Sequence, residues 1–527
     1  MLTVIFRIRK IFFSTLLLLL TLRVAAQPVN QNLSNSIGWD GEPYLACNPE
    51  HSENLIVAWM SFQLPFRLGI EVKSSMDSGQ TWSNSIFLPQ LSNSYTSADV
   101  SIAFGHGYEV YLSYINSRQN PDSGGVFVVR STDGGASWSA PVRAIDVHAS
   151  SEYPVDRPWI VIDNSNTASD GTLYITTKPV SWSPVPNRPT YTVSTDRGIT
   201  WTPLRFADTT GFTSTIINSP MAAPAVDAGG TFHMAYPAIV NFLPAMVLAS
   251  SADQGSTFHR SVFLSPAYLS TDTNPKQAWK LCTDPTNVDN LYFFWTNNSN
   301  GDLDIYTVFS HDHGQNWSSP LRINDDALSN GNMQDMLWAT VSPDDGSIVT
   351  AWRDRRNAPD TGFFQPFDIY TSMSTDGGIS YNRNVKITDT LTPFDTMLSS
   401  AGNDFLSVDA GGNKVHYSWS DYRSGELELY YANILTSGLN LVPTTTDMSF
   451  EVYPVPARDV LYIRQSGKNS GTTDIQLLDI YGRTVTGQKV ENHGGVVSIS
   501  LAKLGEGIYF LKLGYGLQSC IRFPVIR

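Results

Sequence analysis

A nine-residue pattern recurs six times in this 527-residue chain. Its core is Ser-x-Asp-x-Gly-x-x-aromatic, and its aspartates are Asp77, Asp133, Asp196, Asp253, Asp312 and Asp376. Successive aspartates lie 56 to 64 residues apart. A nearly constant period of this length indicates one supersecondary unit that is copied around an axis or along a stack. The pattern therefore restricts the chain to a repeat architecture.

Each copy lies between two strand-like segments, and two more strands precede it. In the first unit these are residues 43–47 and 54–59, separated by an Asn-Pro turn. The second strand recurs seven times, the last time at 414–419 with no pattern after it. Seven units of four short antiparallel strands predict an all-β chain with a seven-bladed β-propeller in residues 27–440. Six blades is the alternative if one unit is wrongly divided.

Both ends of the propeller segment can supply the outer strand that the seventh unit lacks. The two candidates are residues 31–39 and residues 439–442. Residues 441–449, which contain a proline and three threonines, have the composition of a linker. Residues 450–527 alternate apolar and polar positions between glycines and asparagines, and this predicts a small C-terminal β-sandwich.

The first 26 residues have the pattern of a signal peptide. Arg7, Arg9 and Lys10 precede a mostly apolar stretch at 11–22, and small residues at 24–26 suit a cleavage site. The alternative is an uncleaved anchor, although this apolar stretch is short for a membrane span. We expect an exported protein with no stable membrane span after signal cleavage.

The net charge argues against a nucleic-acid-binding protein, and the few cysteines argue against a disulfide framework. The net charge is −14, and removal of the signal peptide takes it to about −18. Nucleic acid is therefore not an expected partner, because phosphate binding needs a basic face. Cys47 and Cys282 take equivalent places in two non-adjacent repeats, so we expect two buried small hydrophobes and no disulfide between them.

The nine-residue pattern resembles the Asp-box, or BNR repeat, of the sialidase superfamily. The resemblance covers most of residues 70–381 and implies a propeller. The same hairpin occurs in sialidases, other glycoside hydrolases, sorting receptors and carbohydrate-binding propellers. The expected chemistry is local: aspartate accepts backbone N–H bonds in the turn, glycine supplies the backbone angle, and the aromatic residue packs under the neighbouring hairpin. All six aspartates are therefore expected to be structural.

The C-terminal segment resembles a type A sorting domain of the type IX secretion system. The residues that carry this resemblance are 453–456, 479–483 with Gly482 at a turn, and 507–512. It implies a Gram-negative cargo protein that meets the secretion machinery through this domain. The body of such a protein is secreted or attached to the outer-membrane surface.

One face of the predicted propeller gathers charged residues. Successive connections alternate between the two faces, so the loops that enter each first strand lie opposite the nine-residue patterns. The residues just before these strands include Glu42, Asp99, Asp156, Arg157, Asp335 and Asp404. Such crowding predicts raised carboxyl pKa values or a cation site suited to Ca²⁺, with no other cofactor. The alternative is that each carboxylate caps its own turn.

A second group of arginines follows the second strands in a Trp-x-Asp/Asn-x-Arg pattern. Its members are Arg353, Arg355, Arg356 and Arg423. The recurrence favours a structural role, in which arginine on one blade pairs with aspartate on the next. The alternative is that these arginines and Arg157 bind an anionic sugar.

The resemblance implies a sialidase-like reaction, with an arginine triad, a tyrosine nucleophile and an aspartate acid/base. Arg157, Arg355 and Arg423 are candidates for the triad, with Tyr422 or Tyr153 as the nucleophile. The Arg-Ile-Pro motif of that family is absent, since the first strand reads Glu-Pro-Tyr-Leu-Ala-Cys. A hydrolase with two catalytic carboxylates, Asp156 and Asp335, is the alternative.

Three functions remain open from the sequence. The protein is a glycoside hydrolase acting on extracellular glycans or glycoproteins, a non-catalytic propeller that binds carbohydrate or protein, or a scaffold without a ligand. An enzyme predicts a deep pocket with converging arginines and carboxylates. A binding protein predicts a shallow face rimmed by aromatic residues.

Overall fold

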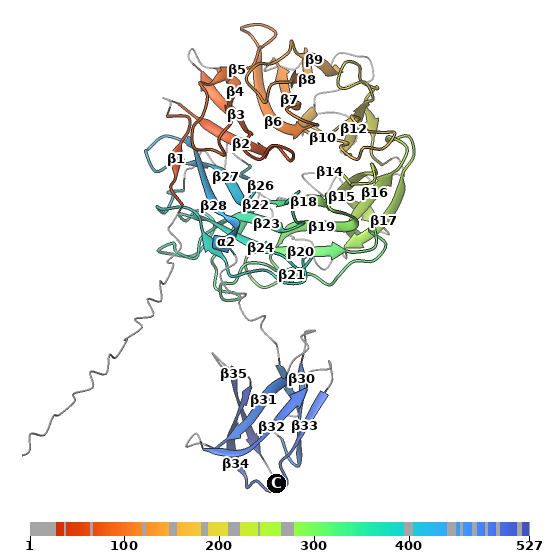
Figure 1. Ribbon diagram of the computed structural model, residues 1–527. Helices are drawn as coiled ribbons and strands as arrows, with labels where there is room; N and C mark the ends of the chain where they lie inside the picture. Colours follow the sequence, from red (N-terminus) through yellow and green to blue (C-terminus); the bar gives the residue numbers. More distant parts are fainter. Residues whose placement is uncertain are drawn as a thin grey trace, which may run out of the picture.

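The computed structural model describes residues 28–35, 38–63, 67–118, 123–146, 155–180, 188–208, 222–240, 243–264, 279–394, 404–439, 450–453, 457–465, 472–479, 483–491, 496–513 and 519–525. They form seven four-stranded sheets around a central axis, and two further sheets of three and four strands (Figure 1). The prediction of an all-β, seven-bladed propeller is confirmed, and the six-bladed alternative is wrong. The predicted signal peptide and linker lie outside the described residues.

The strands of each of the first six blades follow one another in the chain. Blades 1 and 2 are β2 (Asp40–Cys47), β3 (Leu55–Gln63), β4 (Arg67–Ser75), β5 (Ile86–Phe87), β6 (Thr96–Phe104), β7 (Val110–Ser117), β8 (Gly124–Ser131) and β9 (Val142–Asp146). Blades 3 and 4 are β10 (Val155–Ile162), β11 (Leu173–Pro179), β12 (Thr190–Ser194), β13 (Arg205–Phe206), β14 (Ala223–Val226), β15 (Phe232–Val240), β16 (Leu243–Ser251) and β17 (His259–Leu264).

The remaining three blades complete the ring. They are β18 (Trp279–Asp284), β19 (Asn287–Asn297), β20 (Asp304–Ser310) and β21 (Leu321–Arg322), then β22 (Gln334–Val341), β23 (Ile348–Asp354), β24 (Asp368–Ser374) and β25 (Val385–Lys386), then β26 (Ser407–Gly411), β27 (Lys414–Asp421) and β28 (Glu428–Leu435). The first strands of neighbouring blades contact one another around the axis. A short helix, α2 (Thr436–Leu439), follows β28.

The N-terminal segment closes the ring. β1 (Gln31–Asn32) is the fourth strand of the seventh blade and pairs antiparallel with β28, with Gln31 opposite Tyr431. Of the two predicted closures, the N-terminal one is confirmed. Because the sheet of the seventh blade contains strands from both ends of the propeller, opening the ring there requires breaking strand pairing as well as packing.

Tryptophans on the second strands fill the space between blades. Trp59, Trp352 and Trp419 are at most 1% exposed. Each buried indole N–H donates to a carboxylate, as in Trp352 to Asp354 at 2.8 Å and Trp419 to Asp421 at 2.9 Å. This explains the Trp-x-Asp pattern, because a buried indole N–H needs an acceptor.

The hairpins that carry the nine-residue pattern share one hydrogen-bond scheme. In the fourth blade, Asp253 Oδ1 accepts the Thr257 backbone N–H at 2.8 Å, and Oδ2 accepts the Thr257 hydroxyl at 2.6 Å. The Ser251 hydroxyl donates to Oδ1 at 2.7 Å and accepts the Gly255 N–H. Led by the Thr257 hydroxyl, these bonds lower the pKa of Asp253 to about 2. Gly255 has φ +77°, a backbone angle that favours glycine.

Four first strands contain a β-bulge near their start. The strand register shifts within β2, β6, β10 and β22. The bulged residues Glu42, Asp99, Arg157 and Met336 have φ between +49° and +55°. Asp156 and Asp335 each stand one position before the bulged residue. The sequence analysis placed Asp156 and Asp335 at the same repeat position as Glu42 and Asp99. The structure shows that they stand one residue earlier.

The C-terminal segment is a β-sandwich. One sheet has the order β29 (Phe450–Tyr453), β30 (Val460–Gln465), β33 (Val496–Ser500), and the other has the order β32 (Thr484–Glu491), β31 (Thr472–Leu478), β34 (Gly507–Leu513), β35 (Ser519–Val525). Leu461 and Ile499 of the first sheet share one buried cluster with Leu477 and Leu511 of the second. In the described part of the chain, no helix has the length and apolar character that membrane crossing requires.

Candidate functional site

The bulged ends of the first strands bring charged side chains together at one rim of the axis. We call this group the rim cluster; its members are Glu42, Asp99, Asp156, Arg157, Lys178 and Asp404. They come from β2, β6, β10, β11 and the segment before β26. The structure thus joins five of the residues predicted for this face with one lysine that the sequence analysis missed.

Ion pairs and backbone bonds hold the rim cluster. Lys178 Nζ lies 2.5 Å from Asp156 Oδ2, and Arg157 Nη2 lies 2.5 Å from Asp404 Oδ2. The Arg157 backbone N–H donates to Asp99 Oδ2 at 3.1 Å. The Asp404 backbone N–H donates to Glu42 Oε1 at 3.3 Å. Blades 1, 2, 3 and 7 therefore meet in one polar network.

The carboxyl groups of this network differ in pKa. Burial raises the pKa of Glu42 to about 7, and the nearby charge of Asp404 adds to this effect. Burial also raises the pKa of Asp99 well above its usual value, together with the charge of Asp156 and a hydrogen bond to it. Although burial opposes it, the hydrogen bond from Asp99 and the charge of Lys178 lower the pKa of Asp156. Asp99 is thus held as the acid and Asp156 as the carboxylate.

Aromatic side chains fill the axis next to the rim cluster. The Arg157 guanidinium lies 5.1 Å from the centre of the Phe405 ring. Phe405 packs edge-on against Trp159 and Trp338, which also contact each other. Tyr44 packs edge-on against Trp338 at 5.3 Å. We call Tyr44, Trp159, Trp338 and Phe405 the aromatic plug.

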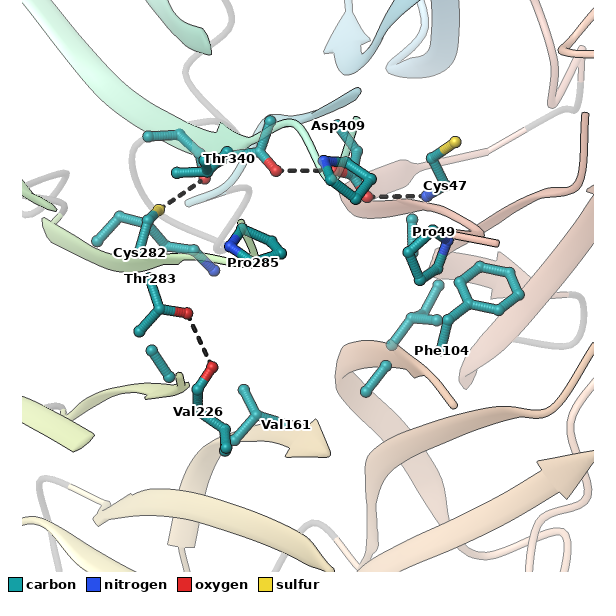
Figure 2. A pocket seen from close by; sticks show the side chains of 18 of the residues that line it. Cys47, Pro49, Phe104, Val161, Val226, Cys282, Thr283, Pro285, Thr340 and Asp409 are labelled. Atoms are coloured by element: carbon teal, nitrogen blue, oxygen red, sulfur yellow. Dashed lines mark hydrogen bonds between the residues drawn. The ribbon is translucent and has the colours of Figure 1, made fainter. Parts of the chain in front are cut away.

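A cavity of about 290 Å³ lies on the axis on the other side of the aromatic plug. The ends of the first strands and the turns after them line it, including Cys47, Pro49 and Pro285 (Figure 2). Lys280 Nζ borders it and lies 4.2 Å from the centre of the Trp338 ring. Asp409 fixes its wall by accepting the Cys47 N–H and the Thr340 hydroxyl, each at 2.8 Å.

This cavity opens toward the hairpin patterns and away from the rim cluster. The turns after the first strands contact the pattern turns, since the Ser78 N–H donates to the Glu53 carbonyl and the Gly134 N–H to the Tyr108 carbonyl. The cavity walls contain Cys47 and Cys282, which are free thiols, as predicted. Burial raises the pKa of both thiols well above the usual value, so both stay protonated.

Asp335 belongs to a separate buried ion triad. Its Oδ1 accepts Arg353 Nε at 2.6 Å and Arg355 Nη1 at 3.0 Å, and its Oδ2 accepts Arg353 Nη2. These three side chains are at most 1% exposed. Arg355 also donates to the carbonyl groups of Phe363 and Met333. Burial opposes ionisation, but the two arginines lower the pKa of Asp335 to about 2.

Arg356 and Arg423 occupy equivalent, mostly buried positions. Arg356 pairs with Asp354 in its own blade and with Asp325, which follows the outer strand of the preceding blade. Arg423 pairs in the same manner with Asp421 and Asp389. Each guanidinium also stacks on a tyrosine ring. The structure therefore places both arginines in contacts between blades.

The two tyrosines considered as nucleophiles lie in different settings. Tyr422 is half-buried in the turn after β27, packed against the propeller core, and its backbone carbonyl accepts the Gly425 N–H. Tyr153 lies outside the described residues.

The sequence analysis missed Lys178 and the aromatic plug, because their position beside the rim cluster depends on how the strands pair. Lys178 stands opposite Asp156 in the ladder between β10 and β11.

Comparisons with known proteins identify the C-terminal segment. Residues 451–527 match the model of the secretion system C-terminal sorting domain. No curated protein matches the chain. Among solved structures, the chain is similar to a protein of unknown function from Dyadobacter fermentans, with 14% identity, a TM-score of 0.44, and coverage of 66% of this chain and 97% of that one.

Two further solved structures are glycoside hydrolases by name. The Hadza microbial sialidase Hz136 is 14% identical, with a TM-score of 0.42 and coverage of 73% of this chain and 77% of that one. The GH93 alpha-L-arabinofuranosidase of Fusarium graminearum is 12% identical, with a TM-score of 0.44 and coverage of 78% and 98%.

Proposed function

We propose that this chain is an exported glycoside hydrolase that acts on extracellular glycans at the rim cluster. Residues 451–527 match a sorting domain of a secretion system, which supports export. The finer assignment, to the type IX system and to the outer surface of a Gram-negative cell, is part of the proposal. Deletion of residues 450–527 is expected to leave the protein inside the cell envelope, as fractionation and immunoblotting would show.

The observation that carries the proposal is the pair formed by Asp99 and Asp156. The two side chains share a hydrogen bond, and their pKa values move in opposite directions. Glycoside hydrolysis uses one protonated carboxyl group and one carboxylate, which stand about 5–9.5 Å apart. The proposal therefore requires that the hydrogen bond between Asp99 and Asp156 opens when the glycan binds between them. Titratable groups whose environments separate their pKa values in this way are candidates for acid and base roles.

The proposed chemistry assigns a role to each member of the pair. Asp99 supplies its proton to the glycosidic oxygen as the bond to the leaving sugar breaks. Asp156, kept ionised beside Lys178, stabilises the positive charge that develops on the sugar ring and then accepts a proton from the attacking water. The ion pair of Arg157 with Asp404 orients the backbone N–H that holds Asp99.

The charges of the rim cluster favour a neutral glycan. Four carboxyl groups stand beside only two cations, and each cation is already paired with Asp156 or Asp404. Because each cation already has a carboxylate partner, an anionic sugar would have to displace Asp156 or Asp404 to form an ion pair there. The remaining predicted arginines are bound to other carboxylates, and Asp335 is enclosed by two of them. The proposal therefore gives Asp335, Arg355 and Arg423 no part in the reaction, and gives Arg157 only the positioning of Asp99.

The test is hydrolysis of a panel of neutral fluorogenic glycosides, with a sialoside included, by the protein without residues 1–26. Asp99→Asn and Asp156→Asn are expected to lower kcat/KM about 100-fold or more on any substrate that the wild type cleaves. Asp360→Asn, at an exposed carboxylate in a loop on the same face, is the matched control. Unchanged kcat/KM in both rim variants, or cleavage of the sialoside alone, would refute the assignment.

The aromatic plug favours a second candidate, a binding protein without catalysis. It fills the axis directly beside the rim cluster, with Arg157 stacked on Phe405. Binding of glycans to an array, unchanged in Asp156→Asn and without release of product, would select this candidate over the enzyme.

A further inference from the structure

Two histidines and an aspartate meet between blades 4 and 5, on the face of the hairpin patterns. Asp227 follows β14, His233 belongs to β15, and His313 lies in the pattern turn after β20 (Figure 1). In the part of the chain that the structure describes, only this group of three His, Cys, Asp or Glu side chains has all its ligand atoms within 4.8 Å of one another. The proposed hydrolase site uses none of them.

Both imidazoles point at one carboxylate oxygen. Asp227 Oδ2 lies 3.0 Å from His233 Nε2 and 3.5 Å from His313 Nε2. The other oxygen, Oδ1, accepts the backbone N–H groups of Gly229 and Thr231, each at 2.9 Å. The turn therefore fixes the carboxylate through Oδ1 and directs Oδ2 to the two rings.

The second nitrogen of each ring is held by an oxygen. His313 Nδ1 lies 3.1 Å from the Val288 carbonyl, which can only accept, so Nδ1 carries the proton. In the neutral ring, Nε2 then presents its lone pair to Asp227 Oδ2. Two acceptors at this distance repel each other unless a proton or a cation lies between them.

The environment of His233 also suits a metal ligand. Its Nδ1 lies 2.8 Å from the Ser250 hydroxyl, and its side chain has no exposed surface. Oxygen partners on the distal nitrogens are a common feature of histidines that bind metals.

We propose that Asp227, His233 and His313 bind a Zn²⁺ ion that joins blades 4 and 5. Two imidazole nitrogens and one carboxylate oxygen are typical zinc ligands at about 2.0–2.2 Å, and ligand atoms around such an ion stand about 3–3.5 Å apart. The spacings of Oδ2 to the two rings are of this size. His313 is one-third exposed, which leaves a path for the ion and a coordination position for water.

The site can be tested with Zn²⁺ alone and with Co²⁺ as a spectroscopic probe. The full chain is treated with a chelator, and its melting temperature is measured with and without Zn²⁺. Co²⁺ is then titrated while its visible absorption is followed. His313→Gln is the first variant, because the equivalent turn position in blade 4 is Gln254 with a similar φ of +56°. Asp227→Asn is the second, because an amide oxygen can keep the two backbone bonds.

The matched control is His311→Gln, in the same turn, where the imidazole Nε2 lies 2.9 Å from the Gly377 carbonyl. We expect one Co²⁺ per wild-type chain, and at least about tenfold weaker binding in His313→Gln and Asp227→Asn. Zn²⁺ raises the melting temperature of the wild type and of His311→Gln only. The inference is overturned if wild-type protein gives no Co²⁺ band or Zn²⁺ shift, if His313→Gln binds like wild type, or if His311→Gln loses binding.

Discussion

The buried ion triad of blade 6 predicts a measurable loss of stability for Asp335→Asn. The substitution keeps the size of the side chain but removes the negative charge between Arg353 and Arg355. Those guanidinium groups are 1% and 0% exposed, and Nε of Arg353 and Nη1 of Arg355 lie 2.6 Å and 3.0 Å from the same carboxylate oxygen. Two buried positive charges would then face each other without a counter-ion.

The expected loss of stability follows from the burial of this triad. Removing one partner of a buried ion pair costs about 3–5 kcal/mol, because an uncompensated charge remains inside the protein. A propeller of roughly 400 residues has an unfolding entropy of about 0.8 kcal/mol per degree. The melting temperature of Asp335→Asn should therefore fall by about 4–6 °C. Its kcat/KM at a temperature where it stays folded should equal that of the wild type, since the carboxylate has no access to substrate.

Differential scanning calorimetry of three variants checks this reasoning. Asp360→Asn, at an exposed position in the same blade, should melt within about 1 °C of the wild type. Asp335→Asn combined with Arg353→Met should melt above Asp335→Asn alone, because methionine fits the aromatic contacts that Arg353 makes with Phe363 and Phe367. A loss below about 1 kcal/mol in Asp335→Asn would refute the structural role, as would a specific loss of kcat with unchanged stability.

Two further predictions concern pH. Burial and the charge of Asp404 raise the pKa of Glu42 from 4.5 to about 7, so the folded state holds this proton more tightly than the unfolded state. Wild-type stability should therefore fall between pH 4.5 and 7. In urea unfolding experiments, we expect this fall to be about 1–3 kcal/mol larger for the wild type than for Glu42→Gln. An equal fall in the two proteins would contradict this. Hydrogen bonds to Glu50 and Asp170 raise the pKa of His106 above 6.5, so its contribution is complete below pH 6.5 and is lost as the pH rises through the raised value. His106→Gln should lower stability by up to about 1 kcal/mol at pH 6 and by almost nothing at pH 9, and an equal loss at both pH values would argue against the ion pairs.

The hairpins and blades could be predicted because their interactions are local. Asp253, its serine and its threonine bond within seven residues of one another, so the pattern alone specifies the turn. The Trp-x-Asp pattern is equally short, since the indole of Trp352 donates to a carboxylate two residues away. Strand length and period then predict the propeller. The sequence left open whether six or seven blades form and which end closes the ring, and strand pairing decides both, with β1 beside β28.

The candidate site could be predicted only in part. The face and five members of the rim cluster follow from the position before each first strand. The bulges shift this position by one residue, and a bulge has no marked sequence pattern because Glu42, Asp99, Arg157 and Met336 all adopt it. Asp156 and Asp335 have the same offset, yet only Asp156 joins the rim cluster. The neighbouring strand decides this, because Lys178 stands opposite Asp156 and Arg353 stands opposite Asp335.

By itself, the sequence determined the repeat, the all-β propeller, the C-terminal sandwich and the turns that fasten each blade, because short-range hydrogen bonds and period-two patterns specify them. Only the tertiary structure decided which charges share an environment. Glu42 and Asp404 are 362 residues apart in the chain and are joined by one backbone hydrogen bond at the rim. Burial and neighbouring charge, which separate the pKa values of Asp99 and Asp156, exist only after seven blades have closed around the axis.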